Sequence, residues 1–184
     1  MIETLKTWDR ELFVFLNNLG IERWDSFWIL VTQIETWIPL FILFIVLIFY
    51  YYKPKNGALV VLFMVLTFIV TIFFTDLVKD FVARLRPNNV EALNDLIRAL
   101  QKPTNHSFFS GHASSSFAVT TFVVLSLRKF TNWIFLAYLW PVLFVTSRIY
   151  VGVHYPSDIL VGALVGTAFA MMGHFLCKRF LLKI

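Results

Sequence analysis

Long apolar stretches dominate this sequence and leave few folds open to it. Five of them lie at about 26–52, 58–85, 113–127, 133–146 and 157–177, and the few charges that they carry fall toward one end of each stretch. A helix needs roughly 20 apolar residues to cross a bilayer. Only 15% of the chain is charged, against roughly a quarter in a soluble domain. We therefore expect an all-α, polytopic bundle of five transmembrane helices, with residues 1–184 forming a single domain.

The first 19 residues have a different pattern from the five stretches. In residues 3–19, apolar side chains recur at helical spacing on one face and charges lie on the other. The uninterrupted apolar part is short, so we expect an amphipathic helix lying in the membrane interface. A sixth transmembrane helix is the alternative.

Two polar features interrupt the predicted spans. Glu35 falls near the start of the first one, where it either lines a cavity or is simply a polar interfacial residue; we favour the latter. Trp140-Pro141 in the fourth span predicts a kink, because proline cannot donate a backbone hydrogen bond.

Positive charges concentrate in alternate turns, which predicts an orientation. With five spans, three basic clusters fall on one side: Lys53/Lys55, Arg128/Lys129 and Lys178/Arg179/Lys183. The positive-inside rule makes this side cytoplasmic. The net charge of +5 is explained in this way, and no nucleic-acid partner is expected. We predict a multi-pass protein of the cytoplasmic (inner) membrane.

Ionisable residues between the last two spans indicate function rather than structure. Arg148, His154 and Asp158 lie at or near membrane depth, where charge is costly. Pro156 suits the first turn of a helix, which places His154 just before that helix. Asp158 can then accept a hydrogen bond from one imidazole nitrogen and leave the other free as a base or nucleophile.

A second basic group ends the second span. Lys79 and Arg86 are seven residues apart, so a continuous helix places them on one face. On the same reasoning Arg84 points elsewhere and is a surface charge, and Pro87 ends the helix. The following loop, 88–109, is predicted to hold a short helix over 91–101.

A third polar group, Ser110-Gly111-His112, opens the third span. Its helix N-terminus and the small residues after it suit an anionic headgroup. All three groups fall at the extracytoplasmic end, and together they indicate a phosphate site. Three nearby cations oppose a zinc site, the nucleophile-elbow pattern of serine hydrolases is missing, and a structural ion-pair network explains too few of these groups.

The other histidines and the single cysteine are expected to lie outside this site. His106 is expected to be solvated, His174 lies at the opposite membrane face, and the single Cys177 forms no intrachain disulfide.

These three motifs resemble the signature of the type 2 phosphatidic acid phosphatase (PAP2) superfamily: Lys79-x6-Arg86-Pro87, Ser110-Gly111-His112 and Ser147-Arg148-x5-His154-x3-Asp158. One departure is Phe109, where the family usually has proline. The resemblance implies that His154 attacks phosphorus, Asp158 orients it, and His112 protonates the leaving oxygen and later activates water. It also implies that the phosphoryl oxygens are held by Lys79, Arg86, Arg148, Ser110 and Gly111.

We therefore expect a membrane lipid phosphatase that needs no metal or other cofactor and no obligate protein partner. The expected substrate is a lipid phosphate, with undecaprenyl pyrophosphate preferred and phosphatidylglycerophosphate or lipid A 1-phosphate as rivals. Two further alternatives are a non-catalytic protein that binds or moves lipid phosphates, and a phosphatase of soluble substrates.

Overall fold

A computed structural model of the chain describes residues 2–181, and these form helices and loops with no strand. The helices are α1 (Ile2–Asn18), α2 (Asp25–Val31), α3 (Ile38–Tyr51), α4 (Pro54–Val82), α5 (Gly111–Leu127), α6 (Leu139–Tyr150) and α7 (Pro156–Leu181). Short 3-10 helices η1 to η5 cover Glu22–Trp24, Ile34–Trp37, Pro87–Asn89, Glu91–Leu93 and Asn132–Tyr138. The predicted all-α membrane bundle is confirmed.

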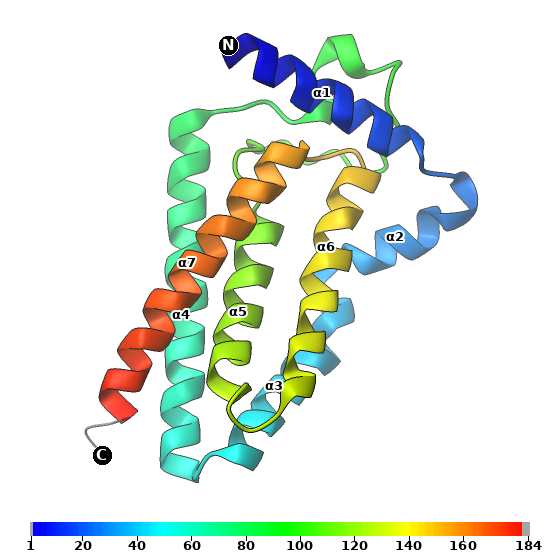
Figure 1. Ribbon diagram of the computed structural model, residues 1–184. Coiled ribbons are helices and arrows are strands. Elements are labelled where there is room, and N and C mark those ends of the chain that lie inside the picture. Colours follow the sequence, from blue (N-terminus) through cyan, green and yellow to red (C-terminus); the bar gives the residue numbers. More distant parts are fainter. Residues whose placement is uncertain (1, 182–184) are drawn as a thin grey trace.

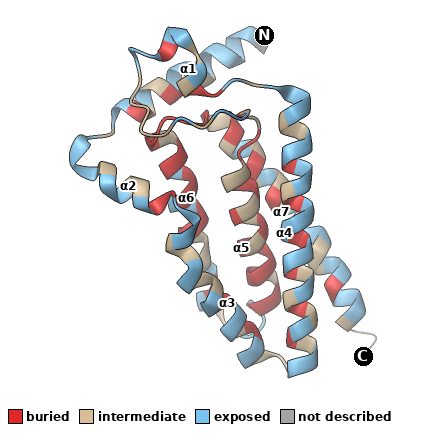
Figure 2. Cartoon of the chain, turned by 180° about the vertical axis from the view of Figure 1, so that it is seen from behind, coloured by how far each residue is buried: buried red, intermediate tan, exposed pale blue. Residues whose placement is uncertain are grey.

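Helix α5 is the centre of the bundle, packed between α4, α6 and α7 (Figure 1). Four helical stretches are long and apolar enough to cross a membrane, at Ile34–Tyr51, Pro54–Leu93, Asn132–Tyr150 and Pro156–Leu181. The fifth predicted span is α5, which is shorter and mostly buried. The outer helices have exposed residues on their outward faces (Figure 2). Many of these residues are large and apolar, as expected for contact with lipid.

The α5–α7 contact depends on the small residues that recur along α7. A Cβ atom at Gly162 would lie 2.7 Å from the carbonyl oxygen of Ser110, and one at Gly166 would lie 2.0 Å from that of Ser114. Both distances are shorter than van der Waals contact, so the two backbones meet only because these residues have no side chain. This agrees with the interpretation of the stripe as a packing surface.

The amphipathic helix expected over 3–19 is α1, which crosses the end of the bundle (Figure 1). Its apolar face, which includes Leu5, Trp8 and Leu12, is exposed. The other face is fixed to the bundle: Asn17 Nδ2 donates to the carbonyl oxygens of Arg98, Ile149 and Tyr150 at 2.9–3.1 Å.

The prediction of one continuous span over 26–52 is wrong in its first part. Helix α2 ends at Val31 and runs across the bundle, whereas η2 and α3 continue along it (Figures 1 and 2). The break is stabilised locally, because Thr36 Oγ1 donates to the carbonyl oxygen of Leu30 and Trp37 Nε1 to that of Val31, both at 2.8 Å. These side chains add to the capping of the last carbonyl groups of α2, where the Leu30 oxygen also accepts from the backbone N–H of Gln33 at 3.1 Å.

Three smaller predictions also need correction. Pro141 does not kink a helix, because it lies in the first turn of α6, where its missing donor costs little. The helix expected over 91–101 is only the turn η4, because the rest of the loop bonds elsewhere; Leu100 N donates to the Val151 carbonyl at 3.0 Å. Helix α4 ends at Val82, before Pro87, with Ala83 in the left-handed conformation at φ 50°.

The elements place the polar motifs at one end of the molecule. The C-terminal ends of α4 and α6 and the N-terminal ends of α5 and α7 meet beneath α1 (Figure 1). The basic clusters at 53–55, 128–129 and 178–179 lie at the opposite helix ends. Lys183 lies outside the described residues.

Candidate active site

His154 is the most buried histidine of the site and is held from both sides of its ring. It lies in the loop between α6 and α7 and is 1% exposed. Arg86 Nη1 lies 2.9 Å from its Nε2, and Asp158 Oδ2 lies 3.4 Å from its Nδ1. A guanidinium group is only a donor, so Nε2 accepts and the ring proton is on Nδ1, directed at Asp158. The lone pair of Nε2 therefore faces the guanidinium group of Arg86.

The surroundings of His154 keep its ring neutral at pH 7. Burial lowers the pKa of His154 well below its ordinary value. The positive charges of Arg86, Arg148 and Lys79 lower this pKa further. A neutral imidazole with a fixed tautomer is the form that can act as a nucleophile.

Asp158, in the first turn of α7, is fully buried and is positioned by several groups. Its Oδ2 accepts from the backbone N–H of Tyr155 at 3.0 Å, and its Oδ1 accepts from Arg84 Nη1 at 2.7 Å. The prediction of Arg84 as a surface charge is therefore wrong. Its physical reason is that α4 ends at Val82, so the helical spacing of Lys79, Arg84 and Arg86 does not apply.

Arg86 is held in the interior by backbone and loop oxygens. Its Nη1 also donates to the carbonyl oxygen of Val153 at 3.0 Å. Its Nε and Nη2 donate to Asn105 Oδ1 at 3.1 and 2.9 Å, and Nε donates to the Asn105 carbonyl at 2.9 Å. Sequence reasoning missed Asn105, because nothing distinguishes a loop asparagine before the loop is folded.

Arg148, on the last turn of α6, is 5% exposed and faces a cavity. Its Nη1 donates to Thr32 Oγ1 and, at 3.1 Å, to Gln101 Oε1. Its Nε is buried and has no hydrogen-bond partner among residues 2–181. A buried N–H without a partner is costly, so this group favours binding of an anion.

That cavity has a volume of about 480 Å³ and opens beside α2, η2 and α4. Its walls combine basic residues, small residues and polar residues: Lys79, Arg148, His112, Gly111, Ser115, Thr32, Gln33, Glu35 and Gln101. The interpretation of Glu35 as a plain interfacial residue is therefore wrong, since the break after α2 brings it to the cavity.

The start of α5 forms the floor of the cavity. Ser110 is the N-cap residue, and its Oγ accepts from the backbone N–H of Ala113 at 3.4 Å. A Cβ atom at Gly111 would lie 3.3 Å from Lys79 Nζ. The missing side chain of Gly111 therefore leaves room for the lysine ammonium group next to the N-terminus of α5. His112 packs against Phe144, with ring centroids 4.8 Å apart.

The histidines outside the motifs are far from this arrangement. His174 Nδ1 lies 3.3 Å from Ser126 Oγ, close to the opposite end of α5, and His106 is a partly buried loop residue. Within residues 2–181, no three side chains of His, Cys, Asp or Glu are grouped in a way that could hold a metal ion.

Comparisons with known proteins match the chain over most of its length. The sequence model of the PAP2 superfamily matches residues 57–179. A lipid A 4'-phosphatase of Bacteroides thetaiotaomicron is 31% identical over 189 residues, which cover 97% of this chain and 81% of that protein. An undecaprenyl-diphosphatase of Sulfolobus acidocaldarius is 31% identical over 157 residues, which cover 85% of this chain and 65% of that protein.

The same fold occurs in a solved structure. The crystal structure of a transmembrane PAP2 type phosphatidylglycerolphosphate phosphatase from Bacillus subtilis superposes with a TM-score of 0.73 at 23% sequence identity. The superposition covers 98% of this chain and 88% of that one.

Proposed function

Because this chain belongs to the PAP2 superfamily and is a multi-pass membrane lipid phosphatase, we propose that it hydrolyses its substrate through a phosphohistidine on His154. The observation that carries this proposal is the fixed tautomer of His154, with Nδ1–H toward Asp158 and Nε2 toward Arg86. In the free enzyme Arg86 donates to Nε2. A phosphate that takes over this donor frees the lone pair for attack.

The first chemical step transfers the phosphoryl group to the protein. Nε2 of His154 forms a bond to phosphorus while the bond from phosphorus to the lipid oxygen breaks. His112, on the wall of the cavity, donates a proton to that leaving oxygen. The buried carboxylate of Asp158 stabilises the positive charge that develops on the ring of His154.

The second step returns the histidine to its starting state. His112, now neutral, removes a proton from a water molecule, whose oxygen attacks phosphorus and breaks the P–N bond. Inorganic phosphate leaves. Throughout both steps Lys79, Arg86 and Arg148 neutralise the phosphoryl oxygens, and the N-terminus of α5 at Gly111 donates to them.

We propose that this reaction needs no metal ion. A divalent cation usually neutralises phosphoryl oxygens in such transfers, and we propose that Lys79, Arg86 and Arg148 take that role here. Activity should persist in EDTA.

We also propose that the site faces the periplasm or the exterior of the cytoplasmic membrane. The described basic clusters at 53–55, 128–129 and 178–179 lie at the opposite ends of the helices. The positive-inside rule assigns those ends to the cytoplasm.

The first candidate substrate is a phosphorylated glycolipid of the lipid A type. The 31% identical lipid A 4'-phosphatase, matched over almost the whole chain, supports it. So does the lining of the cavity, in which Gln33, Glu35 and Gln101 offer amide and carboxylate groups suited to sugar hydroxyls. The 88–109 loop alone has no such set, which is why sequence reasoning favoured a headgroup without sugar.

The second candidate is the polyprenyl pyrophosphate predicted from the sequence. The undecaprenyl-diphosphatase relative supports it, as do three cations for a headgroup whose whole charge is phosphate. Phosphatidylglycerophosphate is a third substrate to test.

The test compares kcat/KM for these lipids in matched detergent micelles with EDTA present, because this ratio alone measures discrimination. We expect lipid A phosphate to exceed the others by about tenfold, or about 1.4 kcal/mol. Glu35→Ala should lower kcat/KM for lipid A phosphate and leave that for undecaprenyl pyrophosphate almost unchanged. A preference for the pyrophosphate in the wild type would assign the second candidate.

The same assay, run with EDTA and with added Mg²⁺, tests the remaining alternatives. A protein that only binds or moves lipid phosphates would release no phosphate from any lipid. A strict Mg²⁺ requirement would refute the proposal of charge neutralisation by arginine and lysine. Faster hydrolysis of a soluble sugar phosphate than of any lipid would show that the substrate is soluble and not a lipid.

A further inference from the structure

We propose that Asp9 on α1 and Arg84 after α4 are positioning residues for His154, and that they connect the interfacial helix to the reaction centre. The proposal rests on the function proposed above, since it concerns the same histidine. Neither residue belongs to the three motifs, and each acts through Asp158 rather than on the substrate.

A continuous chain of two ion pairs and one hydrogen bond joins α1 to the histidine. Arg84 donates through Nη2 to Asp9 Oδ2 at 2.8 Å and through Nη1 to Asp158 Oδ1 at 2.7 Å. The other oxygen of Asp158 lies 3.4 Å from His154 Nδ1. The guanidinium group therefore bridges a carboxylate on α1 and the carboxylate that orients the ring.

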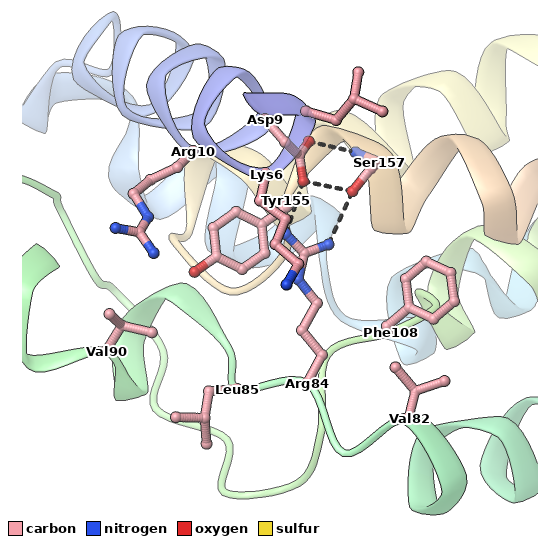
Figure 3. Close-up of a pocket in the computed structure, with 11 residues that line it drawn as sticks. Lys6, Asp9, Arg10, Val82, Arg84, Leu85, Val90, Phe108, Tyr155 and Ser157 are labelled. Carbon is pink, nitrogen blue, oxygen red and sulfur yellow. Dashed lines mark hydrogen bonds and ion pairs between the residues drawn. The ribbon is translucent and has the colours of Figure 1, made fainter. Parts of the chain in front are cut away.

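Asp9 also holds the start of α7, the helix that carries Asp158. Its Oδ1 accepts from the backbone N–H of Ser157 at 2.9 Å, and its Oδ2 accepts from the Ser157 hydroxyl (Figure 3). A carboxylate at a helix N-terminus satisfies a free N–H group and favours the helix dipole. Here the carboxylate comes from another helix, so it fixes α1 against α7.

A packing contact runs beside this ionic chain. The ring of Phe13 on α1 meets the ring of Tyr155 edge to face, with centroids 5.4 Å apart. The guanidinium carbon of Arg84 lies 3.9 Å from the centroid of the same tyrosine ring. Tyr155 follows His154 directly. Before the histidine, Asn17 of α1 donates to the carbonyl oxygens of Ile149 and Tyr150. Helix α1 therefore contacts the chain on both sides of the histidine.

The position of Arg84 separates it from the phosphate-binding cations. It lines a different cavity, of about 620 Å³, between α1, the segment after α4 and the start of α7 (Figure 3). Lys79 and Arg148 line the 480 Å³ cavity with His112. Changing Arg84 should therefore alter the orientation of His154, and hence kcat, while substrate binding stays nearly constant.

Charge explains why the bridge is needed. Asp158 is fully buried, and a buried carboxylate that loses its cationic partner is strongly destabilised in its position. With Arg84 removed, Asp158 keeps the backbone N–H of Tyr155 on Oδ2 but loses the anchor on Oδ1, so its orientation toward Nδ1 is less tightly fixed. With Asp9 removed, Arg84 keeps Asp158 but loses its second anchor, so the effect should be smaller.

The experiment measures kcat and KM for the wild type and for Arg84→Gln, Asp9→Asn and Asp9→Glu in detergent micelles. We expect kcat to fall about 100-fold for Arg84→Gln and about tenfold for Asp9→Asn, with KM within about twofold of wild type. Asp9→Glu keeps the carboxylate and should recover most of kcat. Glu3→Gln is the matched control, because Glu3 is an exposed acid of α1 whose side chain, within residues 2–181, pairs with Lys6 alone at 2.8 Å.

A spectroscopic measurement keeps the proposal testable if a variant is unstable or the substrate is wrong. The ¹⁵N and ¹H signals of His154, assigned with His154→Asn, report which ring nitrogen carries the proton and how strongly the Nδ1–H group bonds to Asp158. We expect the Nδ1–H form in the wild type and in both variants, because Arg86 still donates to Nε2. In Arg84→Gln and Asp9→Asn the Nδ1–H proton signal should shift upfield, because its hydrogen bond to Asp158 weakens. An unchanged Nδ1–H signal in both variants would overturn the positioning role, and so would an unchanged kcat. A wild type without turnover whose Nδ1–H signal still responds would refute the proposed function alone.

Discussion

At the residue scale, Gly111 is the position where the smallest change should have the clearest effect. A Cβ atom there would lie 3.3 Å from Lys79 Nζ and 3.8 Å from Thr75 Cγ2. Gly111→Ala should displace the ammonium group from the helix N-terminus and weaken phosphate binding. We expect KM to rise about tenfold, or about 1.4 kcal/mol, with kcat changed less.

The control for this prediction is the thermal unfolding temperature in detergent, which should stay within a few degrees of wild type, since the added methyl group faces the cavity. An unchanged KM would show that Lys79 does not bind phosphate from its position above Gly111.

Single residues also show how far the sequence predicts the site. The ionisable residues of the motifs could be named in advance, because charge at membrane depth is rare and costly. Arg84 and Asn105 could not be. The assignment of Arg84 assumed that α4 continues to Pro87, whereas the left-handed Ala83 ends it earlier and turns Arg84 toward Asp158.

At the element scale, the contact between α5 and α7 sets the relative position of the two halves of the site. Ser110 N donates to the carbonyl oxygen of Asp158 at 3.0 Å, and Gly162 and Gly166 allow the backbones to approach. Gly166→Val should destabilise the protein by about 1–3 kcal/mol or more, as expected for overpacking of a close contact.

Thermal unfolding in detergent measures this effect. Leu164→Val is the matched control. It introduces the same residue at a position on the outer face of α7 that is 63% exposed. Equal unfolding temperatures for the two variants would contradict the packing account.

Elements were predictable where a long apolar run had a single role, as in α4, α5 and α7. The prediction of one span over 26–52 failed because average hydropathy hides the polar pair Thr32-Gln33, at which the helix breaks. Thr32 accepts from Arg148 inside the fold, and the chain turns there. This turn brings Glu35 to the wall of the cavity, and no local sequence pattern indicates that position.

At the scale of the whole molecule, the central prediction is orientation. A cysteine at the exposed Asn89, near the site, should react with an impermeant thiol reagent added outside intact cells. One at the exposed Asn132, between α5 and α6, should react only after lysis. The buried Cys177 is replaced first. Labelling in the reverse pattern would put the site on the cytoplasmic side.

His154 is the residue on which the proposed mechanism depends most, because it receives the phosphoryl group. The decisive measurement mixes enzyme with a lipid substrate carrying ³²P on its terminal phosphate, quenches in alkali within one turnover, and locates the label by mass spectrometry. We predict transient label on His154 alone, and neither label nor turnover in His154→Ala. Label on another side chain, or substantial turnover by His154→Ala, would contradict the mechanism.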